Sequence, residues 1–73
     1  MKLCSDKKGE LILEEWVSQS IQLIFLQGRV VEIVPKSNNN LLHYLAKLLH
    51  DELGIESTIC YNSLILKNNC LHD

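Results

Sequence analysis

The sequence predicts a small α+β domain folded as a two-layer sandwich, in which the order αββαββ forms a four-stranded antiparallel sheet with both helices on one face. Three observations support this prediction. Residues 41–53 have the apolar spacing of an amphipathic helix. A pair of short segments rich in strand-forming residues lies on each side of this helix, and turn-forming residues join each pair. The 73-residue length allows one small domain over residues 1–73, with residues 1–8 and 68–73 expected to fray.

The first helix is expected in GELILEEWVSQ, residues 9–19, because Leu, Glu and Gln are good helix formers. Ser5 or Asp6 would cap its N-terminus. The residues that fit one helix face are Leu13, Trp16, Val17 and Ser20. The same stretch also alternates apolar and polar residues as a strand does, so the choice between helix and strand over residues 10–26 stays open.

The first hairpin is predicted from SIQLIFLQGRVVEIVPK, where the Gln27-Gly28 step separates two runs of strand length. Residues 20–26 and 29–34 would be its strands, and Pro35 would end the second strand because proline has no amide donor. A helix that runs through residue 26 into a Gly28 cap is the alternative. The high content of β-branched and aromatic residues favours the hairpin.

The second helix is predicted over residues 41–53 by apolar residues that repeat at helical spacing. Asn39 or Asn40 would cap its N-terminus, and Gly54 would end it in the left-handed conformation. The helix should pack on the sheet and form the predicted core of Leu45, Leu48, Leu49, Val31 and Ile33.

A second hairpin is predicted from IESTICY and LILKN, with a turn at Asn62-Ser63. The αββαββ order is similar to one half of a LAGLIDADG homing endonuclease, and the stretch LLHYLAKLLHDELGIESTI resembles the second helix and strand of such proteins, over residues 39–67. The acidic motif that binds the catalytic metal in that family is absent from the first helix. The resemblance therefore implies a similar fold, and a nuclease activity does not follow from it.

Composition and charge argue against several classes of protein. The net charge is −2 and the basic residues are scattered, so the sequence has no basic stripe typical of nucleic-acid binding. The longest apolar runs have about four residues and the N-terminus lacks a signal-peptide core, so neither a membrane span nor secretion is expected. Cys4, Cys60 and Cys70 have no paired spacing, which fits free thiols in the cytoplasm.

The polar residues of the second helix do not form a metal site. His43 and His50 lie on nearly the same azimuth but about 10 Å apart along the axis, and Lys47 occupies the position between them. A site made from Cys4, Cys70 and His72 would need both chain ends to converge and has no CxxC spacing. No catalytic, cofactor-binding or metal-ligating residue is therefore assigned, and no enzymatic activity is expected.

The favoured function is a small cytoplasmic protein-interaction module that self-associates as a homodimer or binds and regulates a larger protein. Trp16 is expected to pack in the core, and the alternative is that it lies at the edge of the domain and anchors a partner. The candidate partner-binding residues are Trp16, Phe25, His43, Lys47 and His50. The alternative function is an accessory nucleic-acid-binding domain that contacts phosphate through the sheet face. Its candidate residues are Lys7, Lys8, Arg29 and Lys36, with Lys67 as a further contributor.

Overall fold

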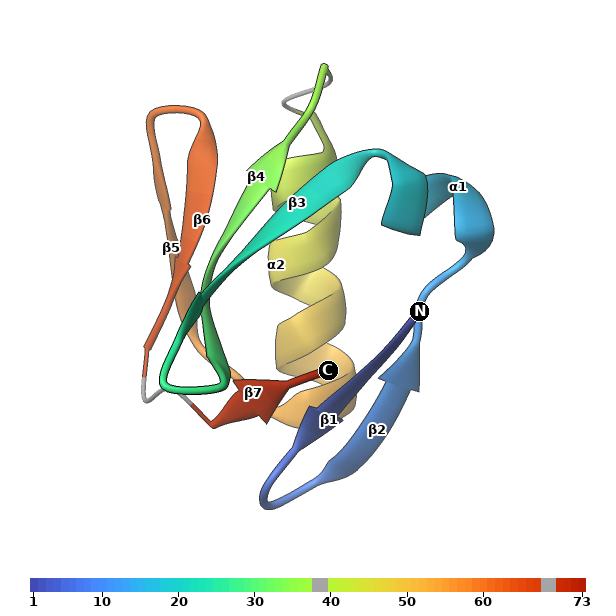
Figure 1. Ribbon diagram of the computed structural model, residues 1–73, viewed down its shortest axis with the longest axis vertical. Coiled ribbons are helices and arrows are strands. Elements are labelled where there is room, and N and C mark those ends of the chain that lie inside the picture. The colour runs from blue at the N-terminus through green and yellow to red at the C-terminus, as the bar shows by residue number, and fades with distance from the viewer. Residues whose placement is uncertain (38–39, 68–69) are drawn as a thin grey trace.

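The computed structural model describes residues 1–37, 40–67 and 70–73 as a small α+β fold made mostly of strands (Figure 1). The elements in chain order are β1 (Lys2–Ser5), β2 (Gly9–Ile12), α1 (Glu15–Gln19), β3 (Ile21–Leu26), β4 (Arg29–Pro35), α2 (Asn40–Leu53), β5 (Ser57–Cys60), β6 (Ser63–Leu66) and β7 (Leu71–His72). The predicted α+β class, the four-stranded antiparallel sheet and the two helices are confirmed.

The strands form two sheets. The four-stranded antiparallel sheet has the order β3-β4-β6-β5, and a three-stranded sheet has the order β2-β1-β7. The three-stranded sheet joins the two chain ends, because Cys4 and Ser5 of β1 pair with His72 and Leu71 of β7. The helix α2 contacts β5 and β6 of the larger sheet and β2 of the smaller one.

The N-terminal region differs from the prediction. Residues 2–5 and 71–72, expected to fray, form β1 and β7. Of the helix expected in residues 9–19, only Glu15–Gln19 is helical, because Gly9–Ile12 is a strand. Ser5 and Asp6 do not cap a helix but begin the β1–β2 turn, where the Lys7 amide donates to the Ser5 hydroxyl at 3.3 Å. These residue types favour turns and helix caps for the same reason, since their side chains bond nearby backbone groups.

The first predicted hairpin is confirmed as β3 and β4. Gln27 and Gly28 have φ values of +53° and +78°, the pair of positive angles that a tight type I′ turn requires. Opposite the step from Ile24 to Phe25 the register shifts, which leaves Val31 as the extra residue of a β-bulge. Val31 is consequently only half-buried, whereas the prediction places it in the core.

The helix α2 begins at Asn40 and ends at Leu53, close to the predicted bounds. Asn39, one of the two predicted caps, lies outside the described residues, and Asn40 is the first helical residue. Gly54 has φ +66° and its amide donates to the His50 carbonyl at 3.0 Å, so the predicted left-handed end of the helix is confirmed.

The second hairpin is also present, with its turn one residue earlier than predicted. The turn residues are Tyr61 and Asn62, because Cys60 pairs with Ser63. Tyr61 adopts φ +57°, an uncommon angle for a bulky residue, and its side chain is almost fully exposed.

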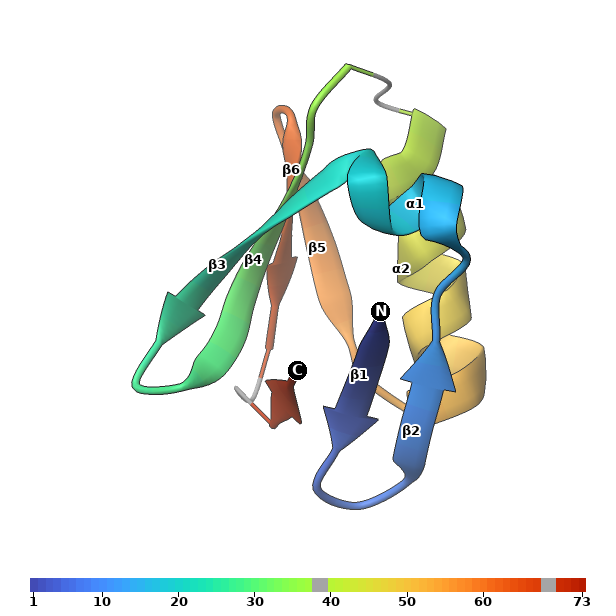
Figure 2. The ribbon, with the colours of Figure 1, turned by 45° about the vertical axis from the view of Figure 1, so that its right-hand side comes forward.

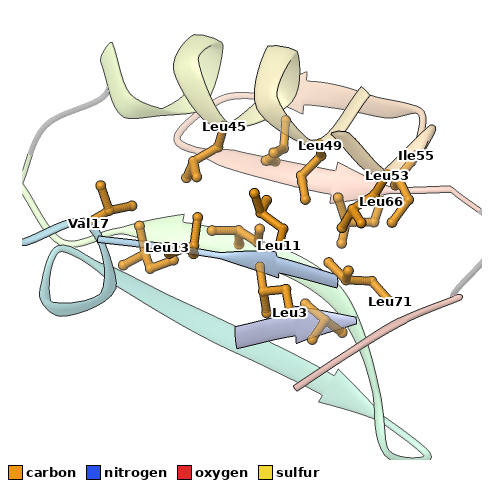
Figure 3. Close-up of a cluster of buried hydrophobic side chains, with 14 of the residues drawn as sticks. Leu3, Leu11, Leu13, Val17, Leu45, Leu49, Leu53, Ile55, Leu66 and Leu71 are labelled. Carbon is orange, nitrogen blue, oxygen red and sulfur yellow. The ribbon is translucent and has the colours of Figure 1, made fainter. Parts of the chain in front are cut away.

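Leucines from both sheets and from α2 form one core (Figure 3). Leu45 and Leu49 point from α2 towards Leu3 of β1 and Leu11 of β2. Leu45, Leu49 and Ile33 are fully buried as predicted, whereas Leu48 is only half-buried at the flank of the helix. The core members are Leu3, Leu11, Leu13, Val17, Ile21, Val30, Ile33, Leu41, Leu42, Leu45, Leu49, Leu53, Ile55, Leu64, Leu66 and Leu71. Neither of the described helices has the length and apolar character needed to cross a membrane.

Candidate interaction surfaces

An aromatic pair lies on the surface where α1 meets α2. The ring centroids of Trp16 and Tyr44 are 6.4 Å apart with an interplanar angle of 29°, which is a stacked arrangement. Trp16 keeps 55% of its surface exposed and Tyr44 keeps 44%, so the stack covers each ring only in part. The expectation that Trp16 packs in the core is therefore wrong, because its neighbour Val17 is the buried residue of α1.

The position of Trp16 is fixed by local hydrogen bonds. Its indole Nε1 donates to the carboxylate of Glu14, the residue before α1. The Ser20 hydroxyl in turn donates to the Trp16 carbonyl at 2.7 Å. The indole N–H is thus already satisfied within the chain, and the exposed part of Trp16 is its apolar ring surface.

Tyr44 of this pair lines a shallow pocket of about 160 Å³ along α2. The pocket is lined by Tyr44, Lys47, Leu48, Asp51 and Glu52. Lys47 Nζ lies 4.0 Å from a carboxylate oxygen of Asp51, one turn further along the helix. An apolar centre with a charged rim is typical of protein-binding surfaces. We call Trp16, Tyr44, Lys47 and Leu48 the aromatic surface.

A second apolar surface lies at the free edge of β3. Exposure increases towards the hairpin tip, from 37% at Ile24 to 47% at Phe25 and 57% at Leu26. Figure 2 shows the end of β3 and the β3–β4 turn projecting away from α2. Phe25, the second predicted aromatic contact residue, therefore lies on a different surface from Trp16.

The two helical histidines lie on α2 before and after Lys47. His43 and His50 are exposed, and His50 Nδ1 lies 3.4 Å from Asp51 Oδ1. His50 lines an open groove of about 350 Å³ together with Ala46, Ile55, Glu56, Ser57 and Lys67. The five predicted contact residues are thus not on one surface: Phe25 lies apart on β3, whereas Lys47 and His50 on α2 both approach Asp51.

The basic candidates are also divided. Lys7 and Lys8 lie in the β1–β2 turn, and Arg29 begins β4, where its Nη1 donates to Asp6 Oδ1 at 2.9 Å. Lys36 follows the opposite end of β4, about 20 Å away at the rise of an extended strand. No single sheet face therefore holds the four predicted phosphate contacts.

The chain ends converge, which the hypothetical cysteine and histidine site would have required. Cys4 lies opposite His72 in the sheet, but His72 Nε2 is 3.3 Å from Asp6 Oδ1, the same oxygen that pairs with Arg29. Within residues 1–37, 40–67 and 70–73, no group of three His, Cys, Asp or Glu side chains could hold a metal ion. All three cysteines are free thiols.

Sequence reasoning missed Tyr44, Ile24 and Leu26 as exposed apolar residues. Tyr44 lies three residues after the buried Leu41 and one before the buried Leu45, so helical geometry places it at the flank of the buried stripe. That signal was readable from the sequence. The exposure of Ile24 and Leu26 depends on which strand lies at the sheet edge. The order of the strands in the sheet was not predicted from the sequence.

Comparison of the chain with protein-family models, curated proteins and solved structures finds no significant match. The resemblance to LAGLIDADG homing endonucleases gains no support from it. Any function must therefore be argued from the surfaces themselves.

Proposed function

We propose that this chain is a small protein-interaction module, without catalysis of its own, that binds and regulates a protein partner through the aromatic surface. The observation that supports the proposal is the Trp16–Tyr44 stack, which leaves more than half of Trp16 in solvent although the core is small. Tryptophan and tyrosine are the residues most enriched where interfaces gain their binding energy.

The surroundings of the stack fit a partner of mixed character. Leu48 and the two rings offer apolar contact, and Lys47, Asp51 and Glu52 offer polar contacts at the rim. Because the indole N–H is bonded to Glu14, a partner would meet the ring face and need not satisfy a buried donor. The proposal includes the two-layer arrangement predicted from the sequence, with both helices on one face of the four-stranded sheet. In this arrangement α1 and α2 lie side by side, and their aromatic residues can form one surface.

The experiment compares proteins captured by the wild-type chain and by three variants, with mass-spectrometric identification. Trp16→Ala and Tyr44→Ala should each lose the same captured protein, with an affinity loss of about 30-fold, typical of removing a strong interface anchor. Tyr61→Ala is the matched control, because Tyr61 is an exposed aromatic residue on the β5–β6 turn. If all four chains capture the same proteins with equal affinity, the aromatic surface is not the binding site.

The nucleic-acid alternative has less in its favour. Arg29 is already paired with Asp6, and Lys36 lies far from Lys7 and Lys8. Binding through phosphate contacts would weaken steeply as salt increases. Titration of mixed duplex and single-stranded probes at low ionic strength therefore separates the two functions.

A further inference from the structure

The four-stranded sheet has one long edge strand, β3. Within residues 1–37, 40–67 and 70–73, the outer strands β2, β7, β3 and β5 each pair on one side only, and β3 at six residues is the longest of these. The residues from Ser18 to Gly28 include no charged side chain and no proline, which are two of the devices that protect an edge. In comparison, β2 carries Glu10 and lies against α2, and β5 presents Ser57 and Thr58 and follows Glu56.

The register shows which backbone groups face this edge. The Lys36 amide donates to the Ser20 carbonyl at 2.8 Å, so that pair is a hydrogen-bonded pair of the β3–β4 ladder. Antiparallel ladders alternate, so Ile24 also bonds to β4, whereas the amide and carbonyl of Leu23 point to the open edge. The two-residue turn after Leu26 makes Phe25 face the edge as well.

The bulge does not interrupt this edge. Its extra residue, Val31, belongs to β4, so the spacing along β3 stays regular. The donors and acceptors of Leu23 and Phe25 therefore stand two residues apart, as a pairing strand requires.

We infer that β3 pairs with β3 of a second copy of this chain, antiparallel and around a two-fold axis at Ile24. This inference rests on the proposed function as an interaction module and names a partner for a different surface. In this register Leu23 of each copy pairs with Phe25 of the other, which makes four backbone hydrogen bonds. The two Ile24 side chains face one another on the outer side of the sheet.

The pairing would bury apolar side chains that are exposed to water in the single chain. Phe25 covers the half-buried Leu23 of the other copy, an aromatic and aliphatic pair of the kind that stabilises sheets. The nearest acidic residue, Glu32, pairs with Ile24 within its own sheet. At the strand spacing of a sheet, the two Glu32 side chains would stand about 14 Å apart, a distance at which salt screens their repulsion.

The test measures the oligomeric state of the pure chain by sedimentation velocity from micromolar to millimolar concentration. The wild type should be in a monomer–dimer equilibrium, and Ile24→Lys should weaken the dimer by about tenfold or more, because two lysines would face each other at the axis. Ile65→Lys is the matched control: Ile65 is also 37% exposed and shares the same cross-strand row, but lies on the inner strand β6. It should leave the dimer intact.

A second measurement tests the register without adding charge. With Cys4, Cys60 and Cys70 changed to Ser, Ile24→Cys should form an intermolecular disulfide under mild oxidation, because facing residues of a non-hydrogen-bonded pair bring their Cβ atoms within reach. Ile65→Cys in the same background should not. A wild type that stays monomeric, a dimer that Ile24→Lys leaves unchanged, or equal loss in both Lys variants overturns the inference.

The proposed function can fail separately. If the chain is monomeric and Trp16→Ala still loses the captured protein, only the β3 dimer is rejected. If the chain is a dimer and Trp16→Ala captures the same proteins as the wild type, only the aromatic surface is rejected as the binding site.

Discussion

Gly54 ends α2 and turns the chain into the core at Ile55, so replacing it tests how the helix is held. Gly54 adopts φ +66°, and the amides of Gly54 and Ile55 donate to the carbonyls of His50 and Leu49 at 3.0 and 3.2 Å. An L-residue with a Cβ pays about 1–2 kcal/mol in this left-handed region. A Cβ added at Gly54 would also lie 3.3 Å from Cε of Lys8, a flexible side chain that can move by a few tenths of an ångström.

We therefore expect Gly54→Ala to reduce the free energy of unfolding by about 1–2 kcal/mol, almost entirely through the backbone. For a domain of this size the melting temperature should fall by about 4–8 °C for each kcal/mol. Gly28→Ala is the matched control, since Gly28 has φ +78° and an added Cβ would meet no atom within 4 Å. The two variants should lose nearly equal stability in urea denaturation, and Gly54→Asn should lose less because asparagine adopts this conformation more readily.

Two outcomes would contradict this expectation. An unchanged urea midpoint in Gly54→Ala would mean that the left-handed helix end is not required. A loss much larger than that of Gly28→Ala, restored to the Gly28→Ala level by adding Lys8→Ala, would mean that Lys8 is held rigidly over the helix end. That second result would contradict the expectation that Lys8 yields.

Two further predictions concern the two sides of α2. Leu49→Ala should reduce the free energy of unfolding by about 2–5 kcal/mol, because Leu49 is fully buried. Leu48→Ala should reduce it clearly less, because Leu48 is half-buried. Urea denaturation midpoints measure both losses, and equal losses would contradict the described orientation of α2. Replacing both His43 and His50 with Gln should change the free energy of unfolding by no more than about 0.5 kcal/mol, since both side chains are exposed. A loss of folding seen by circular dichroism would mean that the histidine face of α2 packs in the core.

The middle of the chain was predictable because each element there has a repeated local pattern. Over residues 41–53 the leucines return at helical spacing, and Gly54 marks the end. In the β3–β4 hairpin, the Gln27-Gly28 turn fixes which residues pair, so strand positions follow from one local signal. The bulge at Val31 was not predicted, because one inserted residue leaves no mark in the composition.

The pairing of the two chain ends was not predictable for a physical reason. The strands β1 and β2 have four residues each, so the alternation that favours a strand in β2 is short and competes with the good helix formers of residues 9–19. The pairing of β1 with β7 joins residues at opposite ends of the sequence, and no local propensity encodes such a contact. A local signal existed in SDKKG, since Gly9 adopts φ +99° after a three-residue turn, which is a known hairpin connection.

The aromatic surface lies beside the buried residues of α1 and α2. Consecutive helical side chains diverge by about 100°, and in α1 Val17 enters the core while Trp16 points aside and stays exposed. In α2, Tyr44 precedes the fully buried Leu45 and is also exposed. Two large rings forced to the surface on neighbouring helices stack on each other, which is worth about 0.5–1.5 kcal/mol beyond the buried area. The stack still leaves more than half of Trp16 in water. A partner that covers this ring face would gain the free energy of burying apolar surface. We therefore place the proposed contact there.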